Sequence, residues 1–530
     1  MRRLLVFALG FMVSGLLVDV SNVIAKETDG DVPLTGISAS LQPDLFTGTL
    51  TGSVPIEVPP GRNGMQPNLV LSYASSGGNG WVGMGWKLEM GTIERQTRWG
   101  VLYSPTPAEE QAGKVYTFRL NGVSADLVQD SVDPNLYRAK IEGNFERIKK
   151  LPAGGWEVTD KKGTKYFFGR TTPFQIQDPT IGIFKWCLER VEDRNGNYMI
   201  MTYTNDQGQG YLSQIDYAGN GATAPTNQVK FYLEDRADKP VMYTSYFPIT
   251  TAKRLKTIEV KASCAPTCVT VGSYKIMYEA GAAQSLMNWV QRFSKDATVN
   301  GTGAISGGTT LPATTMTYST STNAFSNNLW LSVPGWAGAA WPMAVGDFNG
   351  DGKSDVVVNA FQTGNYNVLL SNGTSLTNGL WLSVPGWAGG TVMPQGGGDF
   401  NGDGKSDVVV NAFQSGNYNV LPSFPSNGAL ENAVPNLLVN ITNGMGGATT
   451  IQYVPSTQPQ FQNAPGALPY PVQTVNTEIT CDNWNGTSRT GTASTTIYNY
   501  RDGFHHIGQR EFRGFLYAKE TGPAGPNGEQ

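Results

Sequence analysis

The sequence predicts a multi-domain protein of the all-β class, and three observations support this prediction. The chain has 530 residues, more than a single hydrophobic core organises. Only 15% of the residues are charged, compared with about 25% in an average soluble protein, and 64 residues are glycine. Short alternating or β-branched segments recur between Gly, Asn, Asp and Pro residues, as expected for strands joined by turns.

The first 25 residues have the features of a secretory signal peptide. Arg2 and Arg3 precede an apolar run from Leu4 to Val18, and small or branched residues follow up to Ala25. A membrane anchor is the weaker interpretation, because the run has about 15 residues and a spanning helix needs roughly 20. We therefore expect cleavage after Ala25 and a secreted protein with no membrane span after signal removal.

Residues 26–320 are expected to form an N-terminal β domain of the β-sandwich type. The segment 155–169 is predicted to form a hairpin with Lys-Gly at its turn, and the segment 190–203 a second hairpin with Asn-Gly at its turn. The best candidate for a short helix is the segment 282–294. No other stretch shows a sustained helical period, so strands should dominate this domain.

Two of the four cysteines, Cys264 and Cys268, flank an Ala-Pro-Thr segment. This spacing suits a small disulfide loop at the tip of a hairpin. A zinc half-site is the alternative, but the sequence offers no second cysteine pair to complete it. Cys187, in a Phe-Lys-Trp-Cys-Leu segment, is expected at a buried strand position.

An internal repeat occupies residues 321–430. The segment Leu329–Gly338 recurs as Leu380–Gly389, and Asp347–Gln362 recurs as Asp399–Gln414, with offsets of 51 and 52 residues. A period near 50 residues with several short strands per unit fits a blade of a β-propeller. Near-identity of the two copies also indicates a recent duplication.

Each repeat contains the acidic loop Asp-x-Asn-x-Asp-Gly-Lys-x-Asp. Calcium takes roughly six to eight oxygen ligands, and side chains at alternate positions of a tight loop, with the lysine carbonyl, could supply them. A divalent cation would also turn the repulsion between crowded carboxylates into attraction. A metal-free turn is the alternative, because Asp, Asn and Gly favour turns. We expect structural Ca²⁺ bound by Asp347, Asn349, Asp351, Lys353 and Asp355, and by Asp399, Asn401, Asp403, Lys405 and Asp407.

The loops differ from an EF-hand, because position 12 is Val358 or Val410 rather than glutamate and a β-branched run follows. They resemble the FG-GAP or VCBS-type repeats of integrin-like propellers, in which such loops link adjacent strands. Four tryptophans recur with the repeat, and we expect them to pack between blades rather than to form a glycan platform. They are Trp330, Trp336, Trp381 and Trp387.

The sequence contains no recognisable catalytic motif, and we predict that the protein is not an enzyme. The only histidines, His505 and His506, are adjacent and are expected in an exposed turn. Glu189 and Glu192 lie in an arginine-rich context and are expected to form surface ion pairs. The net charge is -4 and no basic tract is present, which disfavours binding to nucleic acid.

Several segments resemble SpvB-type proteins and insecticidal toxin-complex B proteins of the TcdB/TcaC type. The segments that carry the resemblance to the opening of these proteins are Ile37–Tyr73, Gly78–Trp86 and Gly91–Arg95. Those that resemble their middle domain and the lead into their Rhs-like shell are Asn443–Ser456, Arg501–Phe504 and Gln509–Phe515.

The resemblance implies an SpvB-like domain at 26–320, two calcium-binding FG-GAP/VCBS-type blades at 321–430, and a middle-domain-like segment at 431–530 that begins an Rhs-like β-shell and is truncated. In this family B components form a propeller gate and part of a hollow shell around a toxic effector. SpvB adds a C-terminal ADP-ribosyltransferase, for which this chain shows no counterpart. We therefore expect a secreted scaffold that binds other toxin-complex or Rhs components. The alternative is an integrin-like adhesion or glycan-binding protein, with a host surface protein or glycan as its partner.

Overall fold

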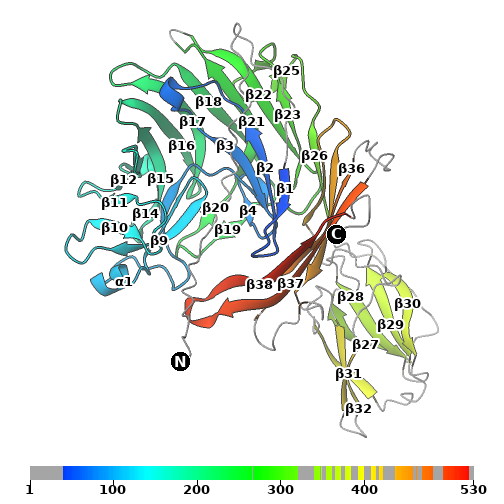
Figure 1. Ribbon diagram of the computed structural model, residues 1–530. Coiled ribbons are helices and arrows are strands. Elements are labelled where there is room, and N and C mark those ends of the chain that lie inside the picture. The colour runs from blue at the N-terminus through cyan, green and yellow to red at the C-terminus, as the bar shows by residue number, and fades with distance from the viewer. Residues whose placement is uncertain are drawn as a thin grey trace, which may run out of the picture. The chain divides into compact units, whose positions relative to one another are not determined.

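The described part of the chain is almost entirely β-structure, which confirms the predicted all-β class (Figure 1). The unit Met1–Thr35, with the predicted signal peptide, lies outside the described residues. The only α-helix within the described residues is α1 (Pro107–Gln111). The computed structural model describes residues 40–264, 267–319, 340–346, 348, 354–360, 365–371, 376–383, 392–398, 407–412, 417–421, 436–456, 461, 468, 470–481 and 493–523.

Eight antiparallel strands close a barrel. Strands β7 to β13 pair in chain order, β13 then pairs with β15, and β15 pairs back with β7, so the ring has no free edge. Aromatic rings fill its interior: Tyr116, Trp156 and Trp186 pack edge to face, with centroids 5.0 to 5.9 Å apart. The strands are β7 (Thr92–Arg95), β8 (Tyr116–Leu120), β9 (Val123–Gln129), β10 (Leu136–Ala139), β11 (Arg147–Lys150), β12 (Trp156–Thr159), β13 (Lys165–Phe168) and β15 (Gly182–Glu192).

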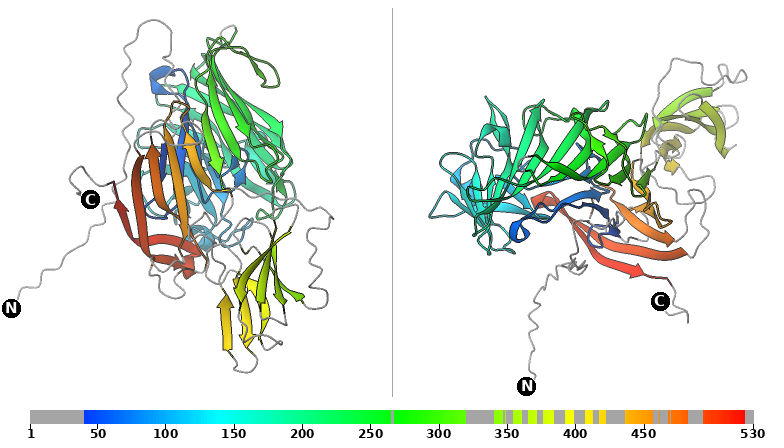
Figure 2. Two further views of the ribbon diagram at one scale, coloured as in Figure 1. Left: turned by 90° about the vertical axis from the view of Figure 1, so that its right-hand side faces the viewer. Right: turned by 90° about the horizontal axis from the view of Figure 1, so that it is seen from above.

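Strand β15 also begins a long antiparallel sheet that extends to β38. The pairing runs from β15 through β16, β17, β18, β21, β22, β23 and β26 to β34, and then in chain order to β38. Figure 2 shows the orange and red strands continuing the green part of this sheet. The further strands are β16 (Asn197–Asp206), β17 (Gln209–Asn220), β18 (Asn227–Asp235), β21 (Lys253–Ala262), β22 (Val269–Tyr278), β23 (Met287–Phe293), β26 (Thr314–Tyr318), β34 (Leu438–Thr442), β35 (Ala448–Pro455), β36 (Gln473–Cys481), β37 (Ala493–His506) and β38 (Glu511–Thr521).

A smaller N-terminal sheet packs against the long one through buried aromatic groups. The Trp86 indole nitrogen donates to the Tyr318 hydroxyl at 2.8 Å, and the Tyr73 hydroxyl accepts from the Leu438 amide at 3.0 Å. These contacts join the start of the chain to strands β26 and β34, more than 200 residues away. The sheet consists of β1 (Ser40–Pro43), β2 (Leu50–Ile56), β3 (Leu69–Ala74) and β6 (Trp86–Lys87).

Short elements complete the described structure. They are β4 (Asn79–Gly80), β5 (Gly83–Met84), β14 (Gln175–Asp178), β19 (Val241–Met242), β20 (Ile249–Thr250), β24 (Thr298–Val299), β25 (Ile305–Ser306), and the 3₁₀ turns η1 (Arg62–Gly64), η2 (Thr172–Phe174) and η6 (Ile507–Gln509). Most are local: β4 pairs with β5, β19 with β20, and β24 with β25, so these pairs shape loops rather than extend the sheet.

The two predicted hairpins are present. Strands β12 and β13 pair across the Lys162-Gly163 turn, and β15 and β16 pair across the Asn195-Gly196 turn. The predicted helix at 282–294 is wrong, because most of this segment forms strand β23 between β22 and β26. Pairing on both sides satisfies its backbone amides and carbonyls, so tertiary contacts override the weak helical pattern.

The repeat segment is inserted between two neighbouring strands of the long sheet. Strand β26 ends at Tyr318, and its partner β34 begins at Leu438. The entry and exit of the insertion are joined at Ser319: its amide donates to the Leu437 carbonyl at 2.9 Å, and its carbonyl accepts from the Asn436 amide at 3.0 Å. We call this hydrogen-bonded crossing, formed by Ser319, Asn436 and Leu437, the neck. The sheet is therefore continuous although about 120 residues separate its two halves in sequence.

The repeats form two separate antiparallel sheets whose first strands, β27 and β31, are in contact. The two copies have matching bulges, between Pro342 and Ala344 in one and between Pro394 and Gly396 in the other. Their strands are β27 (Ala340–Gly346), β28 (Asp355–Ala360), β29 (Asn365–Ser371) and β30 (Leu376–Ser383), and then β31 (Val392–Gly398), β32 (Asp407–Ala412) and β33 (Asn417–Leu421).

Candidate functional site

The acidic loops of the repeats connect paired strands. Gly346 lies opposite Asp355 at the end of β27 and β28, and Gly398 lies opposite Asp407 at the end of β31 and β32. The residues after each loop are strand, as the Val-Val-Val runs predict. The predicted ligands that lie outside the described residues are Asp347, Asn349, Asp351, Lys353, Asp399, Asn401, Asp403 and Lys405.

One predicted ligand can be followed in detail. Asp355 is fully buried at the first position of β28, and its Oδ2 accepts a hydrogen bond from the Phe348 amide at 3.0 Å. This bond spans the loop, because Phe348 is the second residue of the motif and Asp355 is the ninth. Of Asp407 only the backbone, at the start of β32, is described. Within the described residues no cluster of acidic, cysteine or histidine side chains could hold a metal ion.

The other residues singled out by the sequence have structural roles. Cys264 and Cys268 form the expected disulfide, and Cys187 is buried in β15, where burial raises the pKa of its thiol to about 11. Glu189 and Glu192 form the expected ion pairs, with Arg170 at 2.7 Å and Arg190 at 2.8 Å. None of these groups is poised for nucleophilic chemistry.

The expectation for the repeat tryptophans is contradicted at the one position that is described, whereas the expected exposure of the histidines holds for His506. Of the four repeat tryptophans, only Trp381 lies within the described residues, and its 37% exposure on β30 contradicts the expectation that it is part of a packed core. His506 is exposed where β37 meets η6, as expected, and its Nδ1 accepts from the Gln509 amide at 3.0 Å. His505 is half-buried on the same strand and stacks edge to face with Tyr470.

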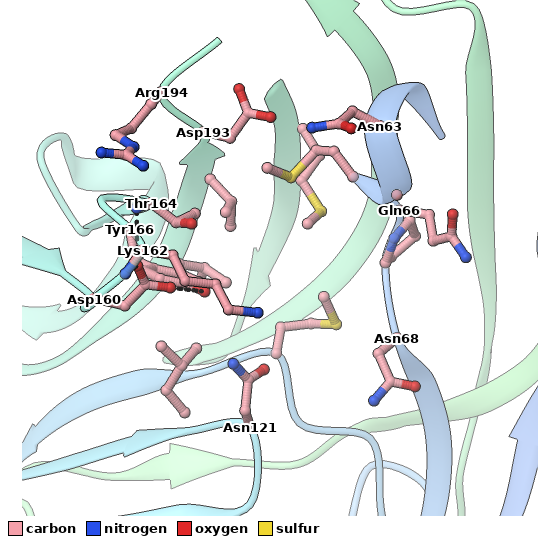
Figure 3. Close-up of a pocket in the computed structure, with 18 of the residues that line it drawn as sticks. Asn63, Gln66, Asn68, Asn121, Asp160, Lys162, Thr164, Tyr166, Asp193 and Arg194 are labelled. Carbon is pink, nitrogen blue, oxygen red and sulfur yellow. Dashed lines mark hydrogen bonds between the residues drawn. The ribbon is translucent and has the colours of Figure 1, made fainter. Parts of the chain in front are cut away.

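A cavity of about 570 Å³ opens where one end of the barrel meets the segment around η1 (Figure 3). Three hairpin turns of the barrel contribute to its wall: β8–β9 with Asn121, β12–β13 with Lys162, and β15–β16 with Arg194. The opposite wall is the segment Asn63–Asn68. Two of these turns, β12–β13 and β15–β16, are predicted by the sequence, but their meeting in one cavity is not. We call this cavity the barrel-end pocket.

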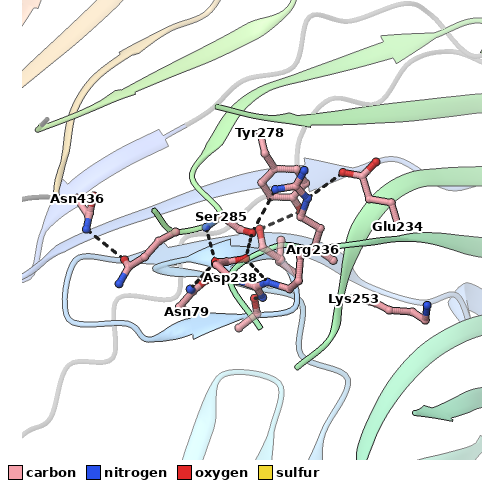
Figure 4. A network of polar contacts seen from close by, with 12 residues as sticks. Asn79, Glu234, Arg236, Asp238, Lys253, Tyr278, Ser285 and Asn436 are labelled. Atoms are coloured by element: carbon pink, nitrogen blue, oxygen red, sulfur yellow. Dashed lines mark hydrogen bonds and ion pairs between the residues drawn. The ribbon is translucent and has the colours of Figure 1, made fainter. Parts of the chain in front are cut away.

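A buried polar cluster lies between the N-terminal β4–β5 hairpin and the long sheet (Figure 4). The Asp238 carboxylate accepts from Nε and Nη2 of Arg236 at 2.7 and 2.6 Å, from Ser285 N and Oγ at 2.7 and 2.8 Å, and from Asn79 at 2.9 Å. The Arg236 side chain is fully buried, and it also donates to the Gly80 carbonyl and Asn79. Burial opposes ionisation of Asp238, but hydrogen bonds from Arg236, Asn79 and Ser285 outweigh it and lower its pKa.

The same cluster reaches the neck of the insertion. Gln284, next to Ser285 in the chain, accepts a hydrogen bond from Asn436 at 3.2 Å. Asn436 is one of the residues that join the two ends of the repeat segment. The cluster therefore links the N-terminal hairpin, the long sheet and the insertion point. It is structural in character, because every oxygen of Asp238 is used within the protein.

The last strand of the long sheet presents a distinct surface. Strand β38 pairs with β37 along one edge. Beyond this pairing, the one backbone hydrogen bond of β38 within the described residues runs from the Phe515 amide to the Phe46 carbonyl, at 2.8 Å. Leu516 on this strand is 85% exposed, and Tyr517 is 37% exposed. We call Leu516, Tyr517 and the backbone of β38 the edge surface.

Three family models match the chain. The model of the Salmonella virulence plasmid 65kDa B protein (SpvB) matches residues 45–261, and that of the insecticide toxin TcdB middle/N-terminal region matches residues 380–530. An FG-GAP-like repeat matches residues 347–410, which include the acidic loops.

Relatives and solved structures agree with these matches. The mono(ADP-ribosyl)transferase SpvB of Salmonella choleraesuis (strain SC-B67) is 23% identical over 234 residues, which are 40% of this chain and 38% of that protein. The SpvB of Salmonella typhimurium gives the same identity and coverage. The crystal structure of TcdB2-TccC3-Cdc42 superposes with a TM-score of 0.63 at 14% identity, covering 90% of this chain and 36% of that one. For TcdB2-TccC3 the TM-score is 0.60 at 16% identity, with 94% and 38% coverage.

The sheets and the inserted FG-GAP-like segment together define a protein that shares its fold with part of the TcdB2-TccC3 structures. More specifically, the matches at residues 45–261 and 380–530 make the chain similar to the N-terminal region of the SpvB and toxin-complex B proteins, as the sequence predicts. It spans less than two fifths of the length of the curated relatives it matches, at 38%. None of the helices in the described part of the chain has the length and apolar character that a bilayer crossing requires.

Proposed function

We propose that the protein is a secreted, non-catalytic scaffold component of a toxin-complex or Rhs-type assembly. The observation that carries the proposal is the edge surface: β38 pairs with β37 along one edge, its one further backbone hydrogen bond within the described residues is that from Phe515 to Phe46, and Leu516 on it is 85% exposed. An exposed strand edge with an apolar side chain as open as Leu516 is a ready template for β-augmentation. The structural neighbours, TcdB2-TccC3 and TcdB2-TccC3-Cdc42, combine more than one protein, which supports this class of partner.

The described side chains favour a scaffold over an enzyme. The carboxylates of Asp238 and Glu94 are occupied by arginine, lysine, serine or asparagine partners. The transferase activity in the name of the SpvB relatives belongs to proteins of which this chain matches 38%. We therefore do not extend that activity to this chain.

The proposal is tested by Leu516→Lys, which places a charge on the edge surface. Lysine on an edge strand opposes pairing with a further strand. We expect the wild-type chain to coelute on size exclusion with an Rhs-type protein from the same genome, and the variant to lose this association. Because Leu516 is 85% exposed, its replacement should change the melting temperature little.

The matched control is Val132→Lys, which also replaces an exposed apolar side chain but lies in the turn between β9 and β10, with 90% exposure. This variant should associate like the wild type. Equal association of both variants, or no association of the wild-type chain, would refute the proposal.

We further propose that the repeat loops bind calcium that stabilises the two blades. The donor set is chemically suitable, because carboxylate, amide and carbonyl oxygens are the ligands that Ca²⁺ prefers. The Asp355–Phe348 hydrogen bond supports it by holding the ninth position of the loop beside the second. A fully buried carboxylate is also costly unless hydrogen bonds or a cation compensate for the lost hydration.

A further inference from the structure

The barrel-end pocket has the size and shape of a ligand site. Its volume of about 570 Å³ falls within the range of small-molecule sites, and its floor and rim differ in chemistry. Buried apolar side chains form the floor, among them Leu120, Leu188, Val191 and Met199. Exposed polar side chains form the rim: Asn63, Gln66, Asn68, Asn121, Lys162, Arg194 and Asn195.

The wall formed by Asn63–Asn68 is anchored before any ligand arrives. Arg62 donates from Nε to the Ala218 carbonyl at 2.9 Å, and the Tyr217 hydroxyl donates to the Pro59 carbonyl at 2.9 Å. The Gln66 side-chain oxygen accepts from the Gly61 amide at 2.9 Å, which closes the segment into a turn. Such a preformed wall reduces the ordering cost of binding.

The charges around the pocket are balanced, which argues against an ionic ligand. The three lining carboxylates are Asp160, Asp193 and Glu89, and the lining cations are Lys162 and Arg194. Glu89 is paired outside the pocket with Lys87, at 3.2 Å. With the partner of Glu89, Lys87, counted beside Lys162 and Arg194, three negative and three positive groups leave no net charge with which to attract an anion or a cation.

The two aspartates are already used to hold their own turns. Asp160 Oδ1 accepts from the Lys162 and Thr164 amides at 2.8 and 2.9 Å. Asp193 Oδ1 accepts from the Asn195 and Asn197 amides at 2.8 and 2.9 Å. Partial burial opposes ionisation of Asp193, but hydrogen bonds from the Asn197 side chain and these amides outweigh it and keep its pKa below the usual value. Asp193 is therefore held ionised, and both aspartates are fixed by the amides of their own turns.

Several rim groups, in contrast, have no partner within the described residues. These are the side chains of Asn68 and Asn195, the cationic groups of Lys162 and Arg194, and the amide nitrogen of Gln66, whose oxygen is occupied. In Figure 3 Lys162 and Asn68 lie on opposite sides of the cavity. Side-chain amides can donate and accept at once, so they match a ligand that carries many hydroxyl groups, each both donor and acceptor.

We propose that the barrel-end pocket binds a neutral oligosaccharide. The amide-rich rim would pair with sugar hydroxyls, the balanced charge favours an uncharged ligand, and the leucine and methionine floor suits the C–H face of a pyranose ring. A second hollow of about 260 Å³ shares Asn121, Lys162 and Tyr166 with the pocket, which provides room for more than one sugar unit. The site lies on residues that the edge surface does not include, so its test is independent of assembly.

The experiment is isothermal titration of the full chain with four neutral probes: maltotriose, cellotriose, chitotriose and lacto-N-tetraose. We expect saturable binding of at least one of them. The variant Asn68→Ala/Lys162→Ala removes two unpartnered rim groups and should weaken that binding at least tenfold. Asn68→Trp, which fills the mouth of the cavity from an exposed position, should abolish it.

The matched control is Asn135→Ala/Lys140→Ala, which removes the same side-chain types from exposed positions that do not line the pocket. It should bind like the wild type, and circular dichroism should show that all variants are folded. Absence of binding to every neutral probe, or equal weakening by the control, overturns the proposal. Preference for 3′-sialyllactose or for an acidic peptide over the neutral probes overturns it as well, because it would show that the ligand is charged.

Discussion

The Asp238 cluster allows a quantitative prediction, because a fully buried arginine depends on one carboxylate. The Asp238→Ala variant removes five hydrogen bonds, two of them from Arg236, whose side chain has no exposed surface. The guanidinium keeps its bonds to Gly80 and Asn79 but loses its counter-charge. Breaking a buried ion pair from one side costs about 3–5 kcal/mol, a large part of the roughly 5–15 kcal/mol that stabilises a typical domain.

The assay is urea denaturation of the full chain, followed by tryptophan fluorescence at neutral pH. The matched control is Asp235→Ala, three residues away, whose carboxylate pairs with Lys253 at 2.8 Å but is 80% exposed. Solvent screens such an exposed pair and it adds little to stability, so this variant should unfold almost like the wild type. Equal, small losses in both variants would refute the reasoning, because they would mean that burial does not make Arg236 dependent on Asp238.

The same pair predicts a pH dependence with a defined sign. The folded-state pKa of Asp238 lies below the unfolded value of 3.8, so the folded protein holds its carboxylate ionised where the unfolded chain would protonate it. The stabilisation is therefore complete above the unfolded pKa and is lost as the pH falls below it towards the folded pKa. The difference in unfolding free energy between wild type and Asp238→Ala should remain constant from pH 7 to pH 5 and decrease below pH 4.

The remaining predictions concern the repeat loops and a thiol. Millimolar Ca²⁺ should raise the melting temperature of the wild-type chain, because a site with Kd of about 10⁻⁴–10⁻³ M adds roughly 1–2 kcal/mol to the unfolding free energy at modest excess of the ion. The double variant Asp351→Ala/Asp403→Ala should abolish this rise. An unchanged rise in the variant would place the ion elsewhere. Burial raises the pKa of the Cys187 thiol to about 11, so this residue should resist iodoacetamide at pH 8 in the native protein and react in urea. Rapid labelling of the native protein at Cys187 would contradict its burial.

Local features of this fold could be predicted from the sequence because short-range chemistry specifies them. The Lys162-Gly163 and Asn195-Gly196 turns place a glycine where positive φ is needed, at 82° and 77°, so each hairpin can be recognised from its own residues. The disulfide between Cys264 and Cys268 follows from a spacing of four residues. Strand β23 was misjudged as a helix because its partners, β22 and β26, decide its conformation, and neither can be recognised from the segment itself.

The sites depend on long-range pairing, which no local pattern encodes. The Asp238 cluster joins Asn79, Arg236 and Ser285, which are separated by up to about 200 residues. The barrel-end pocket gathers three hairpin turns, and the two that contain Asp160 and Asp193 are, taken alone, ordinary Asx-type turns. In the sequence, the pocket is indicated only by turn residues whose side-chain amide and cationic groups have no hydrogen-bond partner within their own turn. That signal acquires meaning only after barrel closure brings the turns together.

The insertion gives a physical reason why repeats can be added to this protein without disturbing its sheet. Strands β26 and β34 pair as neighbours, and the hydrogen bonds at Ser319 join the two ends of the inserted segment. The cost of closing an inserted loop rises only slowly with its length, so one more repeat adds little to the cost of pairing β26 with β34. The offsets of 51 and 52 residues between near-identical copies are the expected trace of such an addition. The neck, held to Gln284 through Asn436, is therefore the position where the sheet tolerates growth of the repeat segment.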